Sequence, residues 1–468
     1  NPMKVRLQNL PYGLRLLLAT LSLGIGTGLV GIACHYLLEG VQELAFGQAS
    51  SDLLQQFQEA GGLRRFLVLC VTGCLAAGFW YVLQRRYKIL SIRQQIDLAG
   101  DRDPAPLAHL LHAGMQVAIV GAGASVGKEG APREVGALLA GRLAKGFSLA
   151  FKERKVLIAC GAGAGLAAVY QVPFASSLFV FETLGLAYSW QNLLLVLTST
   201  YLATWVAQPI VGQEAVYHLS AVSWSASSFL QAIVIAFLVT PLALVFAFLA
   251  KRASHKRRKD GTVLWALPLA FLVLGSLVAF FPIFMGNGQV LAQALLSSQS
   301  IPYLPLTLAV KGLIVYLLLR NGAYGGTLTP SFALGIGSGY LVTLLLTVLG
   351  IHLDPAIGML LGATVFLGTT LEAPLTAIAC PEPWIYRPNL EFVYSACTCG
   401  WSVIRDSKEM GEEMMKVHFV LHETFEVPGA YLKWAQERGH QVTTTKVYEN
   451  EALPETVDEI DFLIVMGG

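Results

Sequence analysis

The chain has 468 residues, of which 54% are hydrophobic and only 13% are charged. Its mean hydropathy of +0.59 is too high for an ordinary soluble domain, and its formal net charge of +2 is too small to indicate a nucleic-acid-binding surface. The composition therefore predicts an all-α polytopic membrane protein without a nucleic-acid partner.

Four apolar runs are long enough to cross a lipid bilayer as helices. They are residues 15–38, 66–83, 229–250 and 264–284. Basic residues follow the second run, at positions 85–88, and precede the fourth, at positions 251–259. Because cytoplasmic loops are enriched in lysine and arginine, we expect both basic loops on the cytoplasmic side of a bacterial inner membrane.

Other apolar segments are short and interrupted by glycine or proline. They are 112–126, 129–145, 156–171, 173–186, 330–349 and 373–379. Broken helices are tolerated at membrane depth only where they line a polar cavity, and transporters point such helix ends at their substrate. Two breaks also recur, because Pro132 and Pro173 have counterparts in Pro330 and Pro374 about 200 residues further on. The pattern predicts two halves related as inverted repeats.

The character of the chain changes near residue 380. We predict a membrane domain over 1–379, a spacer of no clear fold over 380–414 and an incomplete α/β, flavodoxin-like fragment over 415–468. The fragment has patterns typical of three strands and one helix, at 415–422, 442–448, 461–468 and 428–440. Residues 411–416, GEEMMK, resemble a translated ribosome-binding site, so we expect the join to reflect read-through into a neighbouring gene.

The seven cysteines predict no disulfide framework, because their number is odd and most lie in apolar segments. Cys397 and Cys399 form a CxC motif without a second pair, which is a weak metal signal. We therefore expect no metal site and no cofactor.

The stretch GKEGAP at 127–132 places Glu129 between glycines in an otherwise apolar region. Free amides at helix N-termini carry partial positive charge that suits an anion, and glycines let the backbone approach it closely. The sequence GGTLTP at 325–330 has the same character. The residues of the two predicted helix starts are Gly127, Gly130 and Pro132 in the first stretch, and Gly325, Gly326 and Pro330 in the second.

An ionised Glu129 would compete with an anion for these amides and would leave them when protonated. Ionisable groups inside a membrane are usually functional, so we predict that Glu129 is a gate and that Lys128 biases the mouth toward negative charge. The alternative is a surface acid paired with Lys128. We interpret Arg133 and Glu134, one turn further on, as a pair with each other.

Four motifs carry a resemblance to a known family. They are GAGASVGKEGAPREVG (121–136), GAGAGLAAVYQVPFASSLFVFE (161–182), GAYGGTLTPSFALG (322–335) and LEAPLTAI (371–378). In this order and spacing they resemble the CLC chloride channels and chloride/proton exchangers over about residues 12–378. The resemblance implies a transporter of chloride or a similar small anion, not an enzyme, that forms a homodimer with one pathway per subunit. It also implies that Glu129 is the external gating glutamate, and that anions bind around Gly127, Lys128, Gly130, Thr327 and Leu328.

Two positions depart from the family pattern. KILSIRQQI stands where the family has GSGIP, which makes Ser91 the candidate for the serine that binds the inner anion. Exchangers carry an internal glutamate directly after an FxxE motif, whereas FVFET places Glu182 in the motif and Thr183 after it. A hydroxyl cannot hold and release a proton near neutral pH, so we expect no proton coupling by the usual route. Glu182 is a substitute proton carrier or, alternatively, a helix-end acid that holds the structure.

The chain beyond LEAPLTAI gives two further expectations. In the family, LEAPLTAI is followed by a spanning helix and by a last helix with an anion-coordinating tyrosine, which we expect to be missing here, with weaker dimerisation or a leak as the result. Residues 415–468 resemble the start of class I glutamine amidotransferase domains. The nucleophilic cysteine of those domains would lie farther on, so we expect no such activity.

Three alternatives to chloride transport stay open. A fluoride-exporting branch of the family shares the Thr-Pro ending of GGTLTP but has an acid where Thr327 stands. A glutamine amidotransferase is disfavoured because its nucleophile is absent. A membrane scaffold or receptor without a transport role would tolerate the loss of Glu129.

Overall fold

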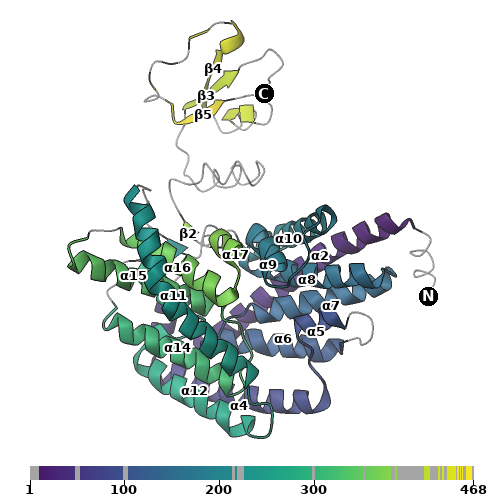
Figure 1. Cartoon of the computed structure of the whole chain (residues 1–468), viewed down its shortest axis with the longest axis vertical. Coiled ribbons are helices and arrows are strands. Elements are labelled where there is room, and N and C mark those ends of the chain that lie inside the picture. Colours follow the sequence, from purple (N-terminus) through teal and green to yellow (C-terminus); the bar gives the residue numbers. More distant parts are fainter. Residues whose placement is uncertain are drawn as a thin grey trace. The chain divides into compact units, whose positions relative to one another are not determined.

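The chain divides into two compact units, Asn1–Pro388 and Asn389–Gly468, in the computed structural model (Figure 1). In the first unit the structure describes residues 10–47, 53–98, 104–212, 217–218, 226–297, 301–351, 354–380 and 385–386. In the second it describes residues 416–421, 431–432, 435–436, 440–449, 451–452, 454, 456 and 460–465.

The described part of the first unit consists of helices and of one pair of two-residue strands. The strands β1 (Tyr217–His218) and β2 (Ile385–Tyr386) pair in parallel, and the 3-10 turn η1 (Pro282–Phe284) follows α12. The helices are α2 (Tyr12–Phe46), α3 (Leu53–Glu59), α4 (Gly62–Arg86), α5 (Ile92–Asp97), α6 (Pro106–Gly121), α7 (Gly130–Gly146), α8 (Phe151–Tyr170), α9 (Pro173–Glu182), α10 (Trp190–Val211), α11 (Ala226–His255), α12 (Val263–Phe280), α13 (Gln289–Leu296), α14 (Leu304–Arg320), α15 (Leu328–Val348), α16 (Pro355–Leu371) and α17 (Pro374–Ala379).

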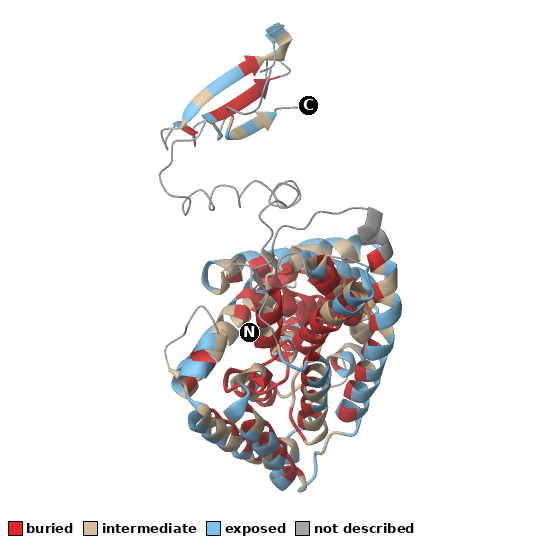
Figure 2. Cartoon of the chain, turned by 90° about the vertical axis from the view of Figure 1, so that its left-hand side faces the viewer, coloured by how far each residue is buried: buried red, intermediate tan, exposed pale blue. Residues whose placement is uncertain are grey.

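Six helices in the described residues are long and apolar enough to cross a membrane. They are α2, α4, α10, α11 from Gln231, α12 and α15. The four predicted spans lie in α2, α4, α11 and the α12–η1 region. Large apolar side chains such as Phe237, Trp265 and Leu345 are exposed, while buried residues fill the interior (Figure 2). An apolar exterior of this kind is suited to a lipid bilayer, because its side chains then contact hydrocarbon instead of water.

The predicted breaks between α6 and α7, between α8 and α9 and between α16 and α17 are confirmed, whereas the segment predicted as broken at 330–349 lies in the spanning helix α15. Two of the breaks have the same local design. The turn between α8 and α9 has Gln171 in the left-handed region, at φ 55°, and Pro173 as the first residue of the next helix. The turn between α16 and α17 repeats this with Glu372 at φ 54° and Pro374. Because proline pre-sets the first helical turn, both junctions restart a helix after one sharp turn. This correspondence supports two related halves.

Glycines bring the helices of each half into close contact. A Cβ on Gly136 of α7 or on Gly161 of α8 would meet backbone of the other helix, so the two helices touch through their main chains. In the second half, Gly339 of α15 and Gly358 of α16 make the same kind of approach. Figure 1 shows α7 beside α8 and α15 beside α16. Small residues allow such packing where helices cannot be held together by the hydrophobic effect.

The second unit contains a parallel sheet in the order β4-β3-β5. Its strands are β3 (Lys416–Leu421), β4 (Gln441–Lys446) and β5 (Phe462–Val465), and the 3-10 turn η2 (Val447–Glu449) follows β4. The prediction of a short parallel α/β fragment is thereby confirmed, with the second predicted strand ending in η2. Of the predicted helix over 428–440, only four helical residues belong to the described part, and the spacer residues Cys397 and Cys399 lie outside it.

Candidate anion pathway

The two glycine-rich stretches singled out in the sequence meet in the structure. Gly127, ahead of α7, and Gly326, ahead of α15, exchange two backbone hydrogen bonds of 2.8 Å as an antiparallel bridge. Each stretch leads directly into a helix N-terminus, since α7 begins at Gly130 and α15 at Leu328. Two helix starts, whose first amides have no partner inside their own helix, are therefore fastened side by side.

Glu129 lies at this junction and is only 1% exposed. Its Oε1 accepts a hydrogen bond of 2.5 Å from the backbone N–H of Leu328, the first residue of α15. Its Oε2 accepts a hydrogen bond of 3.3 Å from the hydroxyl of Tyr170, which is also 3.0 Å from Thr329 Oγ1. The carboxylate thus occupies the positive end of α15, where a free anion would also be stabilised. Its burial excludes the alternative of a surface acid.

The glycines around Glu129 supply the space that its carboxylate fills. A Cβ on Gly127 or on Gly326 would collide with the Glu129 carboxylate, and a Cβ on Gly325 would meet the side chain of Val126. All three glycines are therefore required for this close approach, whatever their backbone angles.

The predicted prolines lie in the first turns of the two helices. Pro132 is the third residue of α7 and Pro330 is the third residue of α15. A first-turn residue has no partner for its N–H inside the helix, so proline is tolerated there without a lost hydrogen bond. Thr327 precedes α15 as its N-cap residue.

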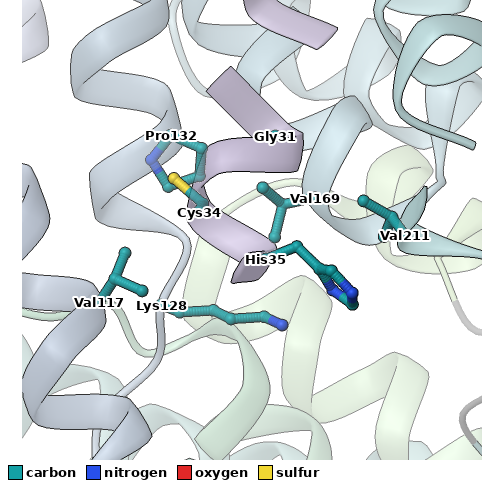
Figure 3. A pocket seen from close by; sticks show the side chains of 8 residues that line it. All are labelled: Gly31, Cys34, His35, Val117, Lys128, Pro132, Val169 and Val211. Atoms are coloured by element: carbon teal, nitrogen blue, oxygen red, sulfur yellow. The ribbon is translucent and has the colours of Figure 1, made fainter. Parts of the chain in front are cut away.

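The Lys128 side chain extends over the ring of Tyr170. Its ammonium nitrogen lies 5.6 Å from the centre of the Tyr170 ring. Figure 3 shows its side chain extended across a small pocket, with the nitrogen on the side of His35. Cys34 lies in the same pocket wall, together with Gly31, Val117, Pro132, Val169 and Val211. The residue that precedes Glu129 in the chain thus carries its basic group into this pocket.

The structure gives Glu182 a defined local role. Its carboxylate accepts hydrogen bonds from the backbone N–H groups of Leu375 (3.0 Å) and Thr376 (2.8 Å) and from the Thr376 hydroxyl (2.7 Å). It therefore caps the N-terminus of α17, as a helix-end acid does. The neighbouring Thr183 hydroxyl is buried and has no hydrogen-bond partner in the described part of the chain.

Ser91 is the N-cap residue of α5. Its hydroxyl accepts a hydrogen bond from Gln94 N–H, and the Gln94 side chain accepts one from Ser91 N–H. This reciprocal capping box explains why a serine begins the helix. Anion binding by Ser91 stays a prediction.

Four residues were missed as a group by sequence reasoning. Glu134 of α7 lies against His109, His112 and Gln116 of α6, all of them buried. The predicted pairing of Glu134 with Arg133 is wrong, because Arg133 instead lies over the ring of Phe179, 4.5 Å from its centre. Consecutive residues of a helix do not face each other, so the side chains of Arg133 and Glu134 contact different neighbours. The available signal was the i, i+3, i+7 spacing of the α6 residues.

Comparison with known proteins identifies the first unit. The family model described as voltage gated chloride channel matches residues 97–380. The voltage-gated ClC-type chloride channel ClcB of Escherichia coli O81 is 28% identical over 383 residues, which cover 77% of this chain and 88% of that protein. A putative glutamine amidotransferase-like protein, YfeJ of Salmonella typhimurium, is 57% identical over 54 residues. That match covers 12% of this chain, and the chain spans only 23% of the length of YfeJ.

Solved structures share the fold of the first unit. A slow cyanobacterial Cl⁻/H⁺ antiporter aligns with a TM-score of 0.68 and 21% identity, over 80% of this chain and 90% of that chain. A CLC-type fluoride/proton antiporter aligns with a TM-score of 0.64 and 22% identity, over 82% and 93%. The fold, the family match and the apolar helices describe a multi-pass protein of the bacterial inner membrane that transports small anions. The chain belongs to the voltage gated chloride channel family.

Proposed function

We propose that the chain conducts chloride across the membrane along a path gated by the carboxylate of Glu129. The observation that carries this proposal is the 2.5 Å hydrogen bond from Leu328 N–H to Glu129 Oε1. A helix N-terminus stabilises an anion through its free amides, and here a side-chain carboxylate holds that position. Chloride and the carboxylate therefore compete for one site.

Protonation of Glu129 is the step that opens the path. A neutral carboxyl group loses its attraction to the amide of Leu328 and to the positive end of α15, so the side chain can leave. The amides of the two bridged helix starts, with Lys128 beside them, are then available to an anion. The anion exchanges its hydration shell for these N–H groups, which act as preorganised donors.

A second candidate substrate is fluoride. The hydroxyl groups of Tyr170 and Thr329 lie 3.0 Å apart next to Glu129, and hydroxyl donors form short, strong hydrogen bonds with a small anion. The solved fluoride/proton antiporter shares this fold. Parallel flux measurements with chloride and fluoride, under equal gradients, distinguish the two substrates.

We further propose a homodimer with one pathway per subunit. The family resemblance supports it, and so does the large exposed apolar surface of the first unit, part of which a second copy can cover. Cross-linking of the purified chain in lipid nanodiscs of defined size tests this state.

The proposed gate is tested by anion efflux from liposomes that contain the purified full-length chain. Efflux through the parent chain should rise as the pH falls, because protonation frees Glu129. The Glu129→Gln variant should conduct without pH dependence. A membrane scaffold without a transport role would give no efflux above protein-free liposomes in either case, and that outcome would overturn the proposal.

A further inference from the structure

A second buried titratable cluster lies beside the proposed gate. The Nδ1 atom of His109 is 2.6 Å from Glu134 Oε1, and the Nδ1 atom of His112 is 2.9 Å from Oε2 of the same carboxylate. The Gln116 amide nitrogen is 2.9 Å from Oε2 and 3.0 Å from His112 Nδ1. Hydrogen bonds among these four side chains hold the cluster together.

The cluster reaches the gate through Gln116. The amide oxygen of Gln116 lies so close to Gly130 that a Cβ there would collide with it, and Gly130 directly follows Glu129. Glu134 lies five residues after Glu129 along α7, which corresponds to about 7.5 Å of helix rise. The Gln116 side chain, which contacts Glu134 Oε2 and lies against Gly130, is the group that bridges this separation.

The other side of the cluster lies near both basic loops. The backbone N–H of Leu90, just after residues 85–88, points to His109 Nε2 at 3.4 Å. His112 packs edge-on against Tyr324 with ring centres 4.4 Å apart, and Arg257 of the 251–259 loop lies 3.9 Å from the centre of that ring. By the positive-inside rule both loops are cytoplasmic. The cluster therefore lies between the cytoplasmic side and Glu129.

The groups that surround the cluster leave one of its nitrogen atoms, His112 Nε2, without a hydrogen-bond partner among the described residues. On the α4 side His112 faces the neutral side chain of Trp80, and Gln84 donates to the hydroxyl of Tyr324. Tyr324 and, beyond it, Arg257 are the titratable groups on the far side of His112. His112 is 3% exposed, and its Nε2 has no hydrogen-bond partner within the described residues.

These contacts decide which ring nitrogens of the two histidines carry a hydrogen. His109 can donate from Nδ1 to Glu134 while its Nε2 accepts from Leu90, which is the pattern of a neutral imidazole. In either tautomer, one ring nitrogen of His112 can accept a proton. The resulting imidazolium is balanced by the ionised Glu134 beside it, so the buried cluster becomes neutral overall when it takes up one proton.

We propose that the cluster of Glu134, His109 and His112 carries protons between the cytoplasmic side and Glu129, at the role left open by Thr183. This inference rests on the proposed function of Glu129. A proton binds a ring nitrogen of His112 and is then transferred to the Glu129 carboxylate, which restores the neutral imidazole and produces a carboxylic acid. Only N–H and O–H bonds form and break, and the chain becomes a proton-coupled anion exchanger.

The test measures chloride and proton movement together in liposomes that contain the full-length chain. An outward chloride gradient is imposed, chloride efflux is followed with an electrode, and proton uptake is followed with a pH electrode. The parent chain should move protons inward as chloride leaves. Glu134→Gln and His112→Gln should keep chloride efflux and lose proton uptake, whereas Glu134→Asp should restore part of it.

Two further variants separate this route from others. Glu372→Gln removes an exposed acid, paired with Lys251, and should leave both movements unchanged. Glu182→Gln tests the competing route through the acid next to Thr183. Because one replacement in the cluster can impair folding, each variant is also compared with the parent by thermal unfolding, and either cluster variant that folds supplies the readout.

The outcomes distinguish the two proposals. Chloride efflux with unchanged proton uptake in folded Glu134→Gln or His112→Gln overturns the proton route, while anion transport stands. Chloride efflux without any proton uptake by the parent overturns it in the same way, as does loss of uptake in Glu182→Gln alone. No chloride efflux by the parent overturns the proposed function and the proton route together.

Discussion

The carboxylate of Glu129 and the backbone N–H of Leu328 form a 2.5 Å hydrogen bond across 199 positions of the chain. The contact exists because Gly127 and Gly326 bridge the two segments and leave room for the carboxylate between them. Tyr170, at the end of α8, completes the surroundings from a third segment. The position of Glu129 therefore depends on tertiary contacts, and substitutions of its neighbours should be as informative as its own.

Removal of the Glu129 carboxylate should leave the anion path open at every pH. We expect Glu129→Ala to raise chloride efflux at neutral pH and to abolish the increase that the parent shows on acidification, because no charged group remains to compete with the anion. Efflux from liposomes over a pH series measures this, with Glu372→Gln as the control acid. A pH response that survives in Glu129→Ala would show that another group controls the path.

Gly326→Ala should displace the Glu129 side chain from Leu328. The added Cβ collides with the carboxylate, and overpacking of this kind costs typically about 1–3 kcal/mol. Gly146→Ala is the matched control, since a Cβ at that position meets nothing within 4 Å. We expect lower thermal stability and higher efflux at neutral pH for Gly326→Ala only.

A double-mutant cycle checks the cause of the Gly326→Ala effect. If the collision is with the carboxylate, Glu129→Ala should remove most of the destabilisation caused by Gly326→Ala, because the two residues are in contact. Additive effects of the two substitutions on the unfolding temperature would assign the damage to some other contact.

Glu182→Gln should weaken the N-terminus of α17. The carboxylate accepts three hydrogen bonds there, and loss of a charged cap costs about 0.5–2 kcal/mol. Thermal unfolding in detergent measures the effect, with Glu372→Gln as the control. An unchanged unfolding temperature for Glu182→Gln would contradict the capping role.

Lys128→Gln should slow anion entry without closing the path. The ammonium at the pocket of Figure 3 attracts anions over distances comparable to the Debye length, so its loss should reduce efflux at low ionic strength more than at high ionic strength. Lys155→Gln, at a cation lying over Phe151, serves as the control. An equal reduction at all salt concentrations would indicate a direct contact with the anion instead of long-range attraction.

Much of the fold could be predicted from local pattern. Apolar runs located α2, α4, α11 and α12, since length and hydropathy decide membrane insertion largely by themselves. Proline and glycine located the helix breaks, and the repeated Pro173 and Pro374 junctions have the same backbone design. The Glu134 cluster was not predicted, because its residues lie on two helices and only their packing brings an acid against two histidines.

The sequence by itself determined the class of the protein, its broken helices and the importance of Glu129, because an acid flanked by glycines in an apolar segment needs a special environment. Only the tertiary structure decided which groups provide that environment. Leu328 N–H, the Tyr170 hydroxyl, and the histidines around Glu134 are assigned by contacts between distant segments, and hydrogen bonds depend on distance and direction in space rather than on spacing along the chain.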